Sequence, residues 1–139
     1  KDDSNFDKEK AKILAQAVEE AGMEDKVTWI SFNPDYLKII SEVMPESRLG
    51  YLTKTEPDKE TIKTLKSLKT EDNEVFTNVK ASQMTKEADS LLDRAGFDFE
   101  AWTVDDEATL EKIYPFECSG ITTNKLTEEE VDKIIDSFE

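Results

Sequence analysis

The side chains available for acid–base chemistry in this sequence are carboxylates, lysines and tyrosines, because the chain contains no histidine. That absence excludes serine or cysteine nucleophiles activated by histidine, zinc held by imidazole, and proton transfer through an imidazole ring. The one cysteine, Cys118, excludes an internal disulfide and any metal site built from several cysteines. A reaction performed by this chain alone would therefore depend on carboxylates, amines or phenols.

Two adjacent carboxylates, Asp105 and Asp106, follow a stretch with the chemistry of a strand. Residues 97–104 are rich in aromatic and β-branched side chains and alternate as a half-buried strand does. Residues 107–114 have the pattern of a helix, and a short carboxylate directly before a helix accepts hydrogen bonds from the unpaired amides of its first turn. The two aspartates are therefore expected to cap this helix rather than to bind a metal ion.

The same step from strand to helix recurs along the whole chain. Strands are expected near residues 27–32, 48–53, 74–79, 97–104 and 119–124. Helices are expected over residues 7–22, 34–44, 58–68, 86–95, 107–114 and 128–138. Successive strands begin roughly 20 to 27 residues apart, which is the length that a right-handed helical crossover between parallel strands requires. The pattern predicts an α/β fold with a parallel sheet.

Two parallel architectures fit this alternation: an open doubly wound sheet, or consecutive units of a (β/α)₈ barrel. The chain has four glycines and no glycine-rich turn after a strand, which argues against a nucleotide-binding doubly wound domain. A helix precedes the first strand, as it would in a segment taken from a longer alternation. A complete barrel needs about 250 residues. We therefore expect residues 1–139 to be a single partial domain that forms the C-terminal half of a TIM (β/α)₈ barrel.

The charge of the chain restricts its partners. Lysine and arginine number 18 against 33 aspartates and glutamates, so the formal net charge is −15. A protein this acidic is repelled by nucleic acid and by anionic lipid. No apolar run approaches the roughly 18 residues that a membrane span needs. The expected partners are a small molecule or another protein, and not a nucleic acid.

Several stretches, in order, resemble the C-terminal part of the glycerophosphodiester phosphodiesterase family. They are Gly22-Met23-Glu24-Asp25-Lys26-Val27, Ile30-Ser31-Phe32-Asn33, Arg48-Leu49-Gly50-Tyr51-Leu52, Ala101-Trp102-Thr103-Val104 and Gly120-Ile121-Thr122-Thr123-Asn124. The sequence departs from the family pattern at Asp105, where asparagine is usual, and at Asn124-Lys125-Leu126, which replaces Asp-Arg-Pro.

The resemblance implies a TIM barrel that hydrolyses glycerophosphodiesters to glycerol 3-phosphate and an alcohol. The family uses a divalent cation, Ca²⁺ or Mg²⁺, held by carboxylates, and a pair of histidines as acid and base. Those residues lie in motifs of the first half of the barrel, and none of these motifs is present here. The resemblance therefore implies no catalytic or metal-binding residue in this chain.

The resemblance also implies a substrate pocket. Ligands meet the carboxyl ends of barrel strands, and the family's Ser-Phe and Trp-Thr-Val-Asn positions line the site beside the glycerol portion of the substrate. Carried over to this sequence, these positions make Ser31, Phe32 and Trp102 the expected substrate-binding residues.

Three functional hypotheses remain open from the sequence. The chain is part of a phosphodiesterase and is inactive alone, or it is a non-catalytic half-barrel that serves in binding or assembly, or it is an unrelated open-sheet domain. A partial barrel leaves an unpaired strand edge and exposed apolar residues such as Trp29, Ile30 and Phe76. The first two hypotheses therefore predict self-association or pairing with the missing N-terminal half.

Overall fold

The computed structural model describes residues 5–139 and shows five strands in one sheet, each followed by an α-helix. The strands are β1 (Thr28–Ser31), β2 (Arg48–Thr53), β3 (Glu74–Lys80), β4 (Phe99–Trp102) and β5 (Gly120–Ile121). The α-helices are α1 (Lys8–Glu20), α2 (Pro34–Val43), α3 (Lys59–Leu68), α4 (Lys86–Ala95), α5 (Glu107–Ile113) and α6 (Glu128–Phe138). Single 3₁₀ turns follow β3 at Ala81–Gln83 and α5 at Tyr114–Phe116.

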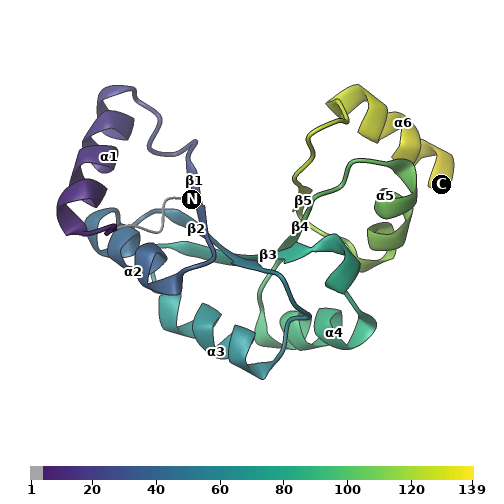
Figure 1. The fold of residues 1–139 in the computed structure, drawn as a ribbon, viewed down its shortest axis with the longest axis horizontal. Coiled ribbons are helices and arrows are strands. Elements are labelled where there is room, and N and C mark those ends of the chain that lie inside the picture. The colour runs from purple at the N-terminus through teal and green to yellow at the C-terminus, as the bar shows by residue number, and fades with distance from the viewer. Residues whose placement is uncertain (1–4) are drawn as a thin grey trace.

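All neighbouring strands are parallel, and their order in the sheet is the order of the sequence, β1-β2-β3-β4-β5. A doubly wound sheet reverses its strand order at a switch point, whereas a barrel adds each strand beside the last. The order therefore confirms the barrel-type interpretation over the open doubly wound sheet. In Figure 1 the sheet curves into an arc with the helices on its convex side and an open concave side.

The helix boundaries follow from capping chemistry that the sequence predicts. The side chain of Asn33 accepts a hydrogen bond from the Asp35 amide at 2.9 Å, and Pro34 is the first residue of α2. Thr127 and Glu130 form a reciprocal capping box at the start of α6. Gly96 ends α4 in the left-handed conformation, with φ at 78°. Local sequence thus accounts for where these helices begin and end.

The last two strands are shorter than the sequence predicts. After Trp102 and Ile121 the two segments continue side by side, and the Val104 amide donates to the Thr122 carbonyl at 2.8 Å. Beyond this point the two segments are joined through a side chain instead of backbone hydrogen bonds. The Asn124 amide and the Thr123 hydroxyl both donate to the Asp105 carboxylate. Asp105 therefore holds two loops together at the carboxyl edge of the sheet.

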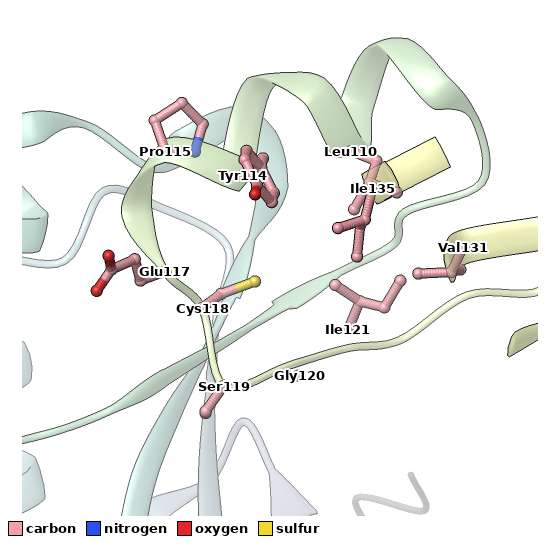
Figure 2. Close-up of a pocket in the computed structure, with 10 residues that line it drawn as sticks. All are labelled: Leu110, Tyr114, Pro115, Glu117, Cys118, Ser119, Gly120, Ile121, Val131 and Ile135. Atoms are coloured by element: carbon pink, nitrogen blue, oxygen red, sulfur yellow. The ribbon is translucent and has the colours of Figure 1, made fainter. Parts of the chain in front are cut away.

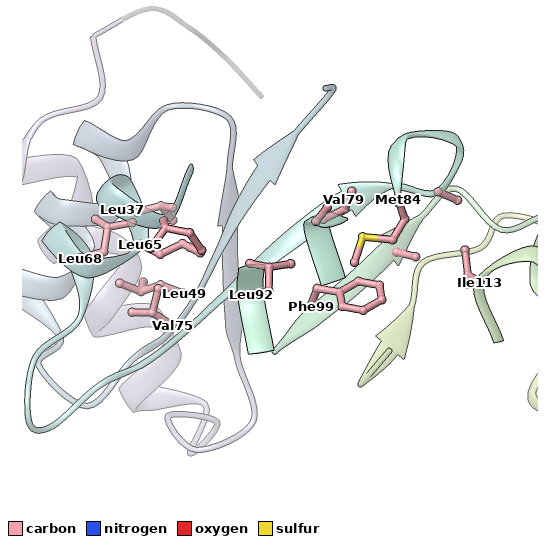
Figure 3. Close-up of a cluster of buried hydrophobic side chains, with 14 of the residues drawn as sticks. Leu37, Leu49, Leu65, Leu68, Val75, Val79, Met84, Leu92, Phe99 and Ile113 are labelled. Carbon is pink, nitrogen blue, oxygen red and sulfur yellow. The ribbon is translucent and has the colours of Figure 1, made fainter. Parts of the chain in front are cut away.

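The core lies between the sheet and the helices on its convex side (Figure 3). Leu49 and Val79 project from the sheet and are fully buried, as is Leu65 from α3. Burial of several such side chains, each worth about 1.5–3 kcal/mol, supplies the main driving force for folding. Among the described residues, no helix is long and apolar enough to cross a membrane.

The concave face carries the alternate residues of each strand. Ile30 is 48% exposed there, as expected for a partial barrel, and Trp29 is half-buried on the other face. The expectation that Phe76 is exposed is wrong, because it is only 3% exposed. The Arg48 guanidinium lies 4.1 Å from the centroid of the Phe76 ring and covers it.

Candidate functional site

The aromatic side chains of Phe32 and Trp102 meet at the carboxyl edge of the sheet. Phe32 follows β1 and Trp102 ends β4, so two strands separate them in the sheet. Their ring centroids are nevertheless 5.8 Å apart, with an interplanar angle of 80° in an edge-to-face arrangement. The curvature of the sheet therefore brings together two of the residues that the sequence singles out, and Phe32 remains 40% exposed.

Trp102 is held in a fixed orientation by the neighbouring strand. Its indole Nε1 donates a hydrogen bond to the Asn78 carbonyl at 3.0 Å. This bond uses the only polar hydrogen of the side chain, so the exposed part of the indole offers a ligand an apolar surface.

Asn78 is a functional candidate that sequence reasoning missed. It lies inside β3, is 1% exposed, and its side-chain oxygen Oδ1 has no hydrogen-bond partner. A buried amide oxygen without a partner is costly and persists where a structure has another use for it. The sequence signal that could have identified it is an asparagine in the middle of a predicted strand, directly before Val79.

The structure places Ser31 apart from the aromatic pair. Its hydroxyl accepts a hydrogen bond from the Asn33 amide at 3.0 Å, and its side chain shares a pocket with Trp29 and Tyr36 on the helix side of β1. Successive strand residues point to opposite faces, so Ser31 and Phe32 lie on different faces. The structure therefore gives Ser31 a role in the turn that leads into α2.

A lysine completes the group around Phe32. Lys54, the first residue after β2, places its Nζ atom 4.7 Å from the centroid of the Phe32 ring. Both side chains line a pocket of about 430 Å³ between the end of β2 and the start of α3. No local sequence pattern selects this lysine, because its contact with Phe32 joins residues that follow different strands.

The carboxylates near this edge serve as caps and loop contacts. Asp106 caps α5, and its hydrogen bonds from Thr109 hold the pKa of its carboxyl below the usual value. In residues 5–139 no group of three or more acidic, histidine or cysteine side chains could hold a metal ion. The described residues thus offer no donor set that fits the divalent cation implied by the resemblance.

A second pocket, of about 440 Å³, lies beside the unpaired edge of β5 (Figure 2). Leu110, Ile121 and Ile135 give it an apolar lining. Cys118 lies at its rim, where burial raises the pKa of the thiol. A third, smaller pocket lies between β1 and the helices that cover it, at the opposite end of the sheet.

Solved structures share this fold over most of the chain. A candidate glycerophosphodiester phosphodiesterase from Galdieria sulphuraria matches with a TM-score of 0.81 and 16% identity, covering 98% of this chain and 55% of that one. An Oleispira antarctica phosphodiesterase in complex with its product sn-glycerol-3-phosphate matches with a TM-score of 0.70 and 20% identity, covering 88% and 49%. A glycerophosphodiester phosphodiesterase from Parabacteroides distasonis matches with a TM-score of 0.74 and 24% identity, covering 97% and 55%.

The chain thus spans about half the length of these solved structures. No match is found among curated proteins. The sequence model of the glycerophosphoryl diester phosphodiesterase family matches residues 1–128, which is most of the chain. Together with the parallel sheet in barrel order, this match shows that the chain belongs to the glycerophosphoryl diester phosphodiesterase family.

Proposed function

We propose that this chain forms the substrate-pocket side of a glycerophosphodiester phosphodiesterase barrel, in which Phe32 and Trp102 contact the glycerol portion of the substrate. The full reaction would be metal-dependent hydrolysis of a glycerophosphodiester to glycerol 3-phosphate and an alcohol. The acid, the base and the metal ligands would come from the complementary half of the barrel, so this chain alone is inactive.

The observation that carries the proposal is the contact between Phe32 and Trp102 at the carboxyl ends of β1 and β4. Barrel enzymes bind their substrates at this end. The exposed ring of Phe32 and the apolar surface of Trp102 offer adjoining walls to the carbon atoms of glycerol. The side-chain oxygen of Asn78, on the strand beside Trp102, is a buried acceptor without a hydrogen-bond partner close to this pair.

The proposed partner of the chain is the complementary half of the barrel. Five strands leave three to complete a barrel of eight. The outer edges of β1 and β5 have no neighbouring strand among the described residues. Added strands would pair with these edges and cover Ile30. Without that half, the same edges favour self-association.

Binding of sn-glycerol 3-phosphate to the 139-residue chain tests the placement of the pocket. The indole N–H of Trp102 gives an NMR signal that can be told from that of Trp29 by a Trp29→Phe variant. We expect the Trp102 signal to shift on titration, with a dissociation constant of about 1–10 mM for so small a ligand.

Replacing Phe32 by alanine should weaken this binding at least about 5-fold, because it removes one apolar wall. Phe138→Ala is the matched control. Phe138 lies at the end of α6 and packs on Tyr114 of the 3₁₀ turn after α5, far along the chain from the proposed pocket. A Trp102 signal that does not respond to the ligand, or equal binding by the two variants, would contradict the proposed pocket.

A further inference from the structure

Two lysines stand at the carboxyl ends of neighbouring strands beside the aromatic pair. β2 and β3 pair in a register that places Thr53 beside Val79, so Lys54 and Lys80 are the next residues of the two strands. Lys80 is in turn the register partner of Trp102. The lysines therefore flank the position where Phe32 and Trp102 meet.

Neither lysine is neutralised by a described carboxylate. The ion pairs of residues 5–139 involve Lys8, Lys12, Arg48 and Lys133, and neither Lys54 nor Lys80 is among them. Both side chains are exposed at the edge of the sheet. An exposed ammonium group without an ion pair can attract an anionic ligand, even in a chain with a formal net charge of −15.

Three acidic side chains, Glu56, Asp58 and Glu60, follow Lys54 in the chain, and Glu60 lines the same pocket as Lys54. Glu56 accepts a hydrogen bond from the Thr85 hydroxyl at 2.5 Å, in the loop that follows Lys54. Asp58 caps α3, where the hydrogen bond from the Thr61 amide lowers the pKa of its carboxyl. None of these carboxylates forms an ion pair with Lys54 or Lys80, so both ammonium groups remain available to an anion.

The contact with Phe32 directs Lys54 toward the proposed pocket. An ammonium group attracted to the face of an aromatic ring keeps a preferred position there. It has three N–H donors, and those that do not face the ring can donate to a ligand that lies beside the ammonium group. A ligand resting on Phe32 would therefore carry its negative charge next to Lys54.

We propose that Lys54, with Lys80 beside it, binds the phosphate group of a glycerophosphate ester whose carbon skeleton lies on Phe32 and Trp102. This inference rests on the proposed function and makes Lys54 a specificity-determining residue: the pocket selects a phosphorylated polyol over a neutral one.

The test compares three variants of the 139-residue chain with the unmodified chain, using the Trp102 indole signal. Lys54→Met removes the charge, Lys54→Arg keeps it, and Lys66→Met removes an equal charge from the exposed face of α3, near the amino ends of the strands. The ligands are sn-glycerol 3-phosphate, inorganic phosphate and glycerol.

We expect Lys54→Met to weaken binding of sn-glycerol 3-phosphate about 5-fold, the upper range for one exposed charge pair, and to reduce the dependence of binding on salt. Lys54→Arg and Lys66→Met should bind like the unmodified chain. Glycerol should bind equally to all variants, because it offers the lysine no charge. Inorganic phosphate should bind weakly and lose affinity in Lys54→Met, which would identify the phosphate group itself as what Lys54 binds.

Equal affinity of Lys54→Met and Lys66→Met for sn-glycerol 3-phosphate would overturn the inference and leave the aromatic pocket standing. If sn-glycerol 3-phosphate shifts no Trp102 signal, the proposed pocket fails, and the inorganic phosphate titration then decides on the lysines. Phosphate binding that depends on Lys54 would support an anion site there, and its absence would overturn that site too.

Discussion

Replacing Gly50 by alanine is expected to lower the free energy of unfolding by about 2 kcal/mol, within the range for an overpacked interior. A Cβ atom at Gly50 would lie 2.4 Å from Cζ of Phe76 and 2.9 Å from Cγ2 of Ile30. The Phe76 ring is 3% exposed and lies beneath the Arg48 guanidinium, so it has little room to move away. Urea unfolding followed by circular dichroism measures the effect.

Gly120→Ala is the matched control on the same concave face. The atoms nearest to a Cβ there belong to the Glu100 side chain, the closest at 3.1 Å, and a flexible carboxylate can move by the distance required. We expect this variant to lose less than about 1 kcal/mol. Equal stability of Gly50→Ala and the unmodified chain would mean that β1, β2 and β3 are not packed as tightly as the structure shows.

Arg48→Met is expected to cost about 2 kcal/mol, because one side chain connects four others on the concave face. Its guanidinium lies 3.0 Å from Glu100 and 3.4 Å from Glu74, and it donates to the Thr28 hydroxyl at 3.2 Å. The Glu100 side chain is only 20% exposed, so removal of its partner leaves a partly buried charge unpaired. Breaking a fully buried pair costs about 3–5 kcal/mol, and partial exposure reduces this figure.

The comparison variant is Lys133→Met in α6. Lys133 pairs with Glu129 at 2.8 Å, a shorter distance than any in the Arg48 group, but both side chains are more than 70% exposed. Exposed pairs contribute about 0.3–0.5 kcal/mol within a helix. An equal loss in free energy of unfolding for Arg48→Met and Lys133→Met would contradict this prediction. It would mean that partial burial does not strengthen the interactions of Arg48.

The sequence predicted the elements well because each has its own local signal. Pro34 at the start of α2, Gly96 after α4 and the pair Thr127 and Glu130 at α6 act within a few residues, and all three occur as expected. Strand ends were less predictable, since Asp105 replaces ladder hydrogen bonds with side-chain contacts to a loop distant in sequence. The alternation alone suits both parallel architectures, and the strand order of the structure confirms the barrel that we expected.

The candidate site was partly predictable. The family resemblance predicts that Phe32 and Trp102 line one pocket at the carboxyl ends of their strands, and their rings lie 5.8 Å apart in the structure. Ser31 could not be placed in this way, because one step along a strand reverses the direction of a side chain. Lys54 and the unpaired oxygen of Asn78 depend on contacts between strands that no local pattern reveals.

The central claim is that this chain supplies the wall of a phosphodiesterase pocket and none of the groups that perform the reaction. The most direct test is to incubate the purified chain with glycerophosphocholine and Mg²⁺ or Ca²⁺ and to measure the release of glycerol 3-phosphate. We expect no release from this chain alone, and release when a polypeptide carrying the complementary half of the barrel is added. Hydrolysis by the chain alone that disappears in a Trp102→Ala variant would contradict the claim, because that activity could not come from a contaminating enzyme.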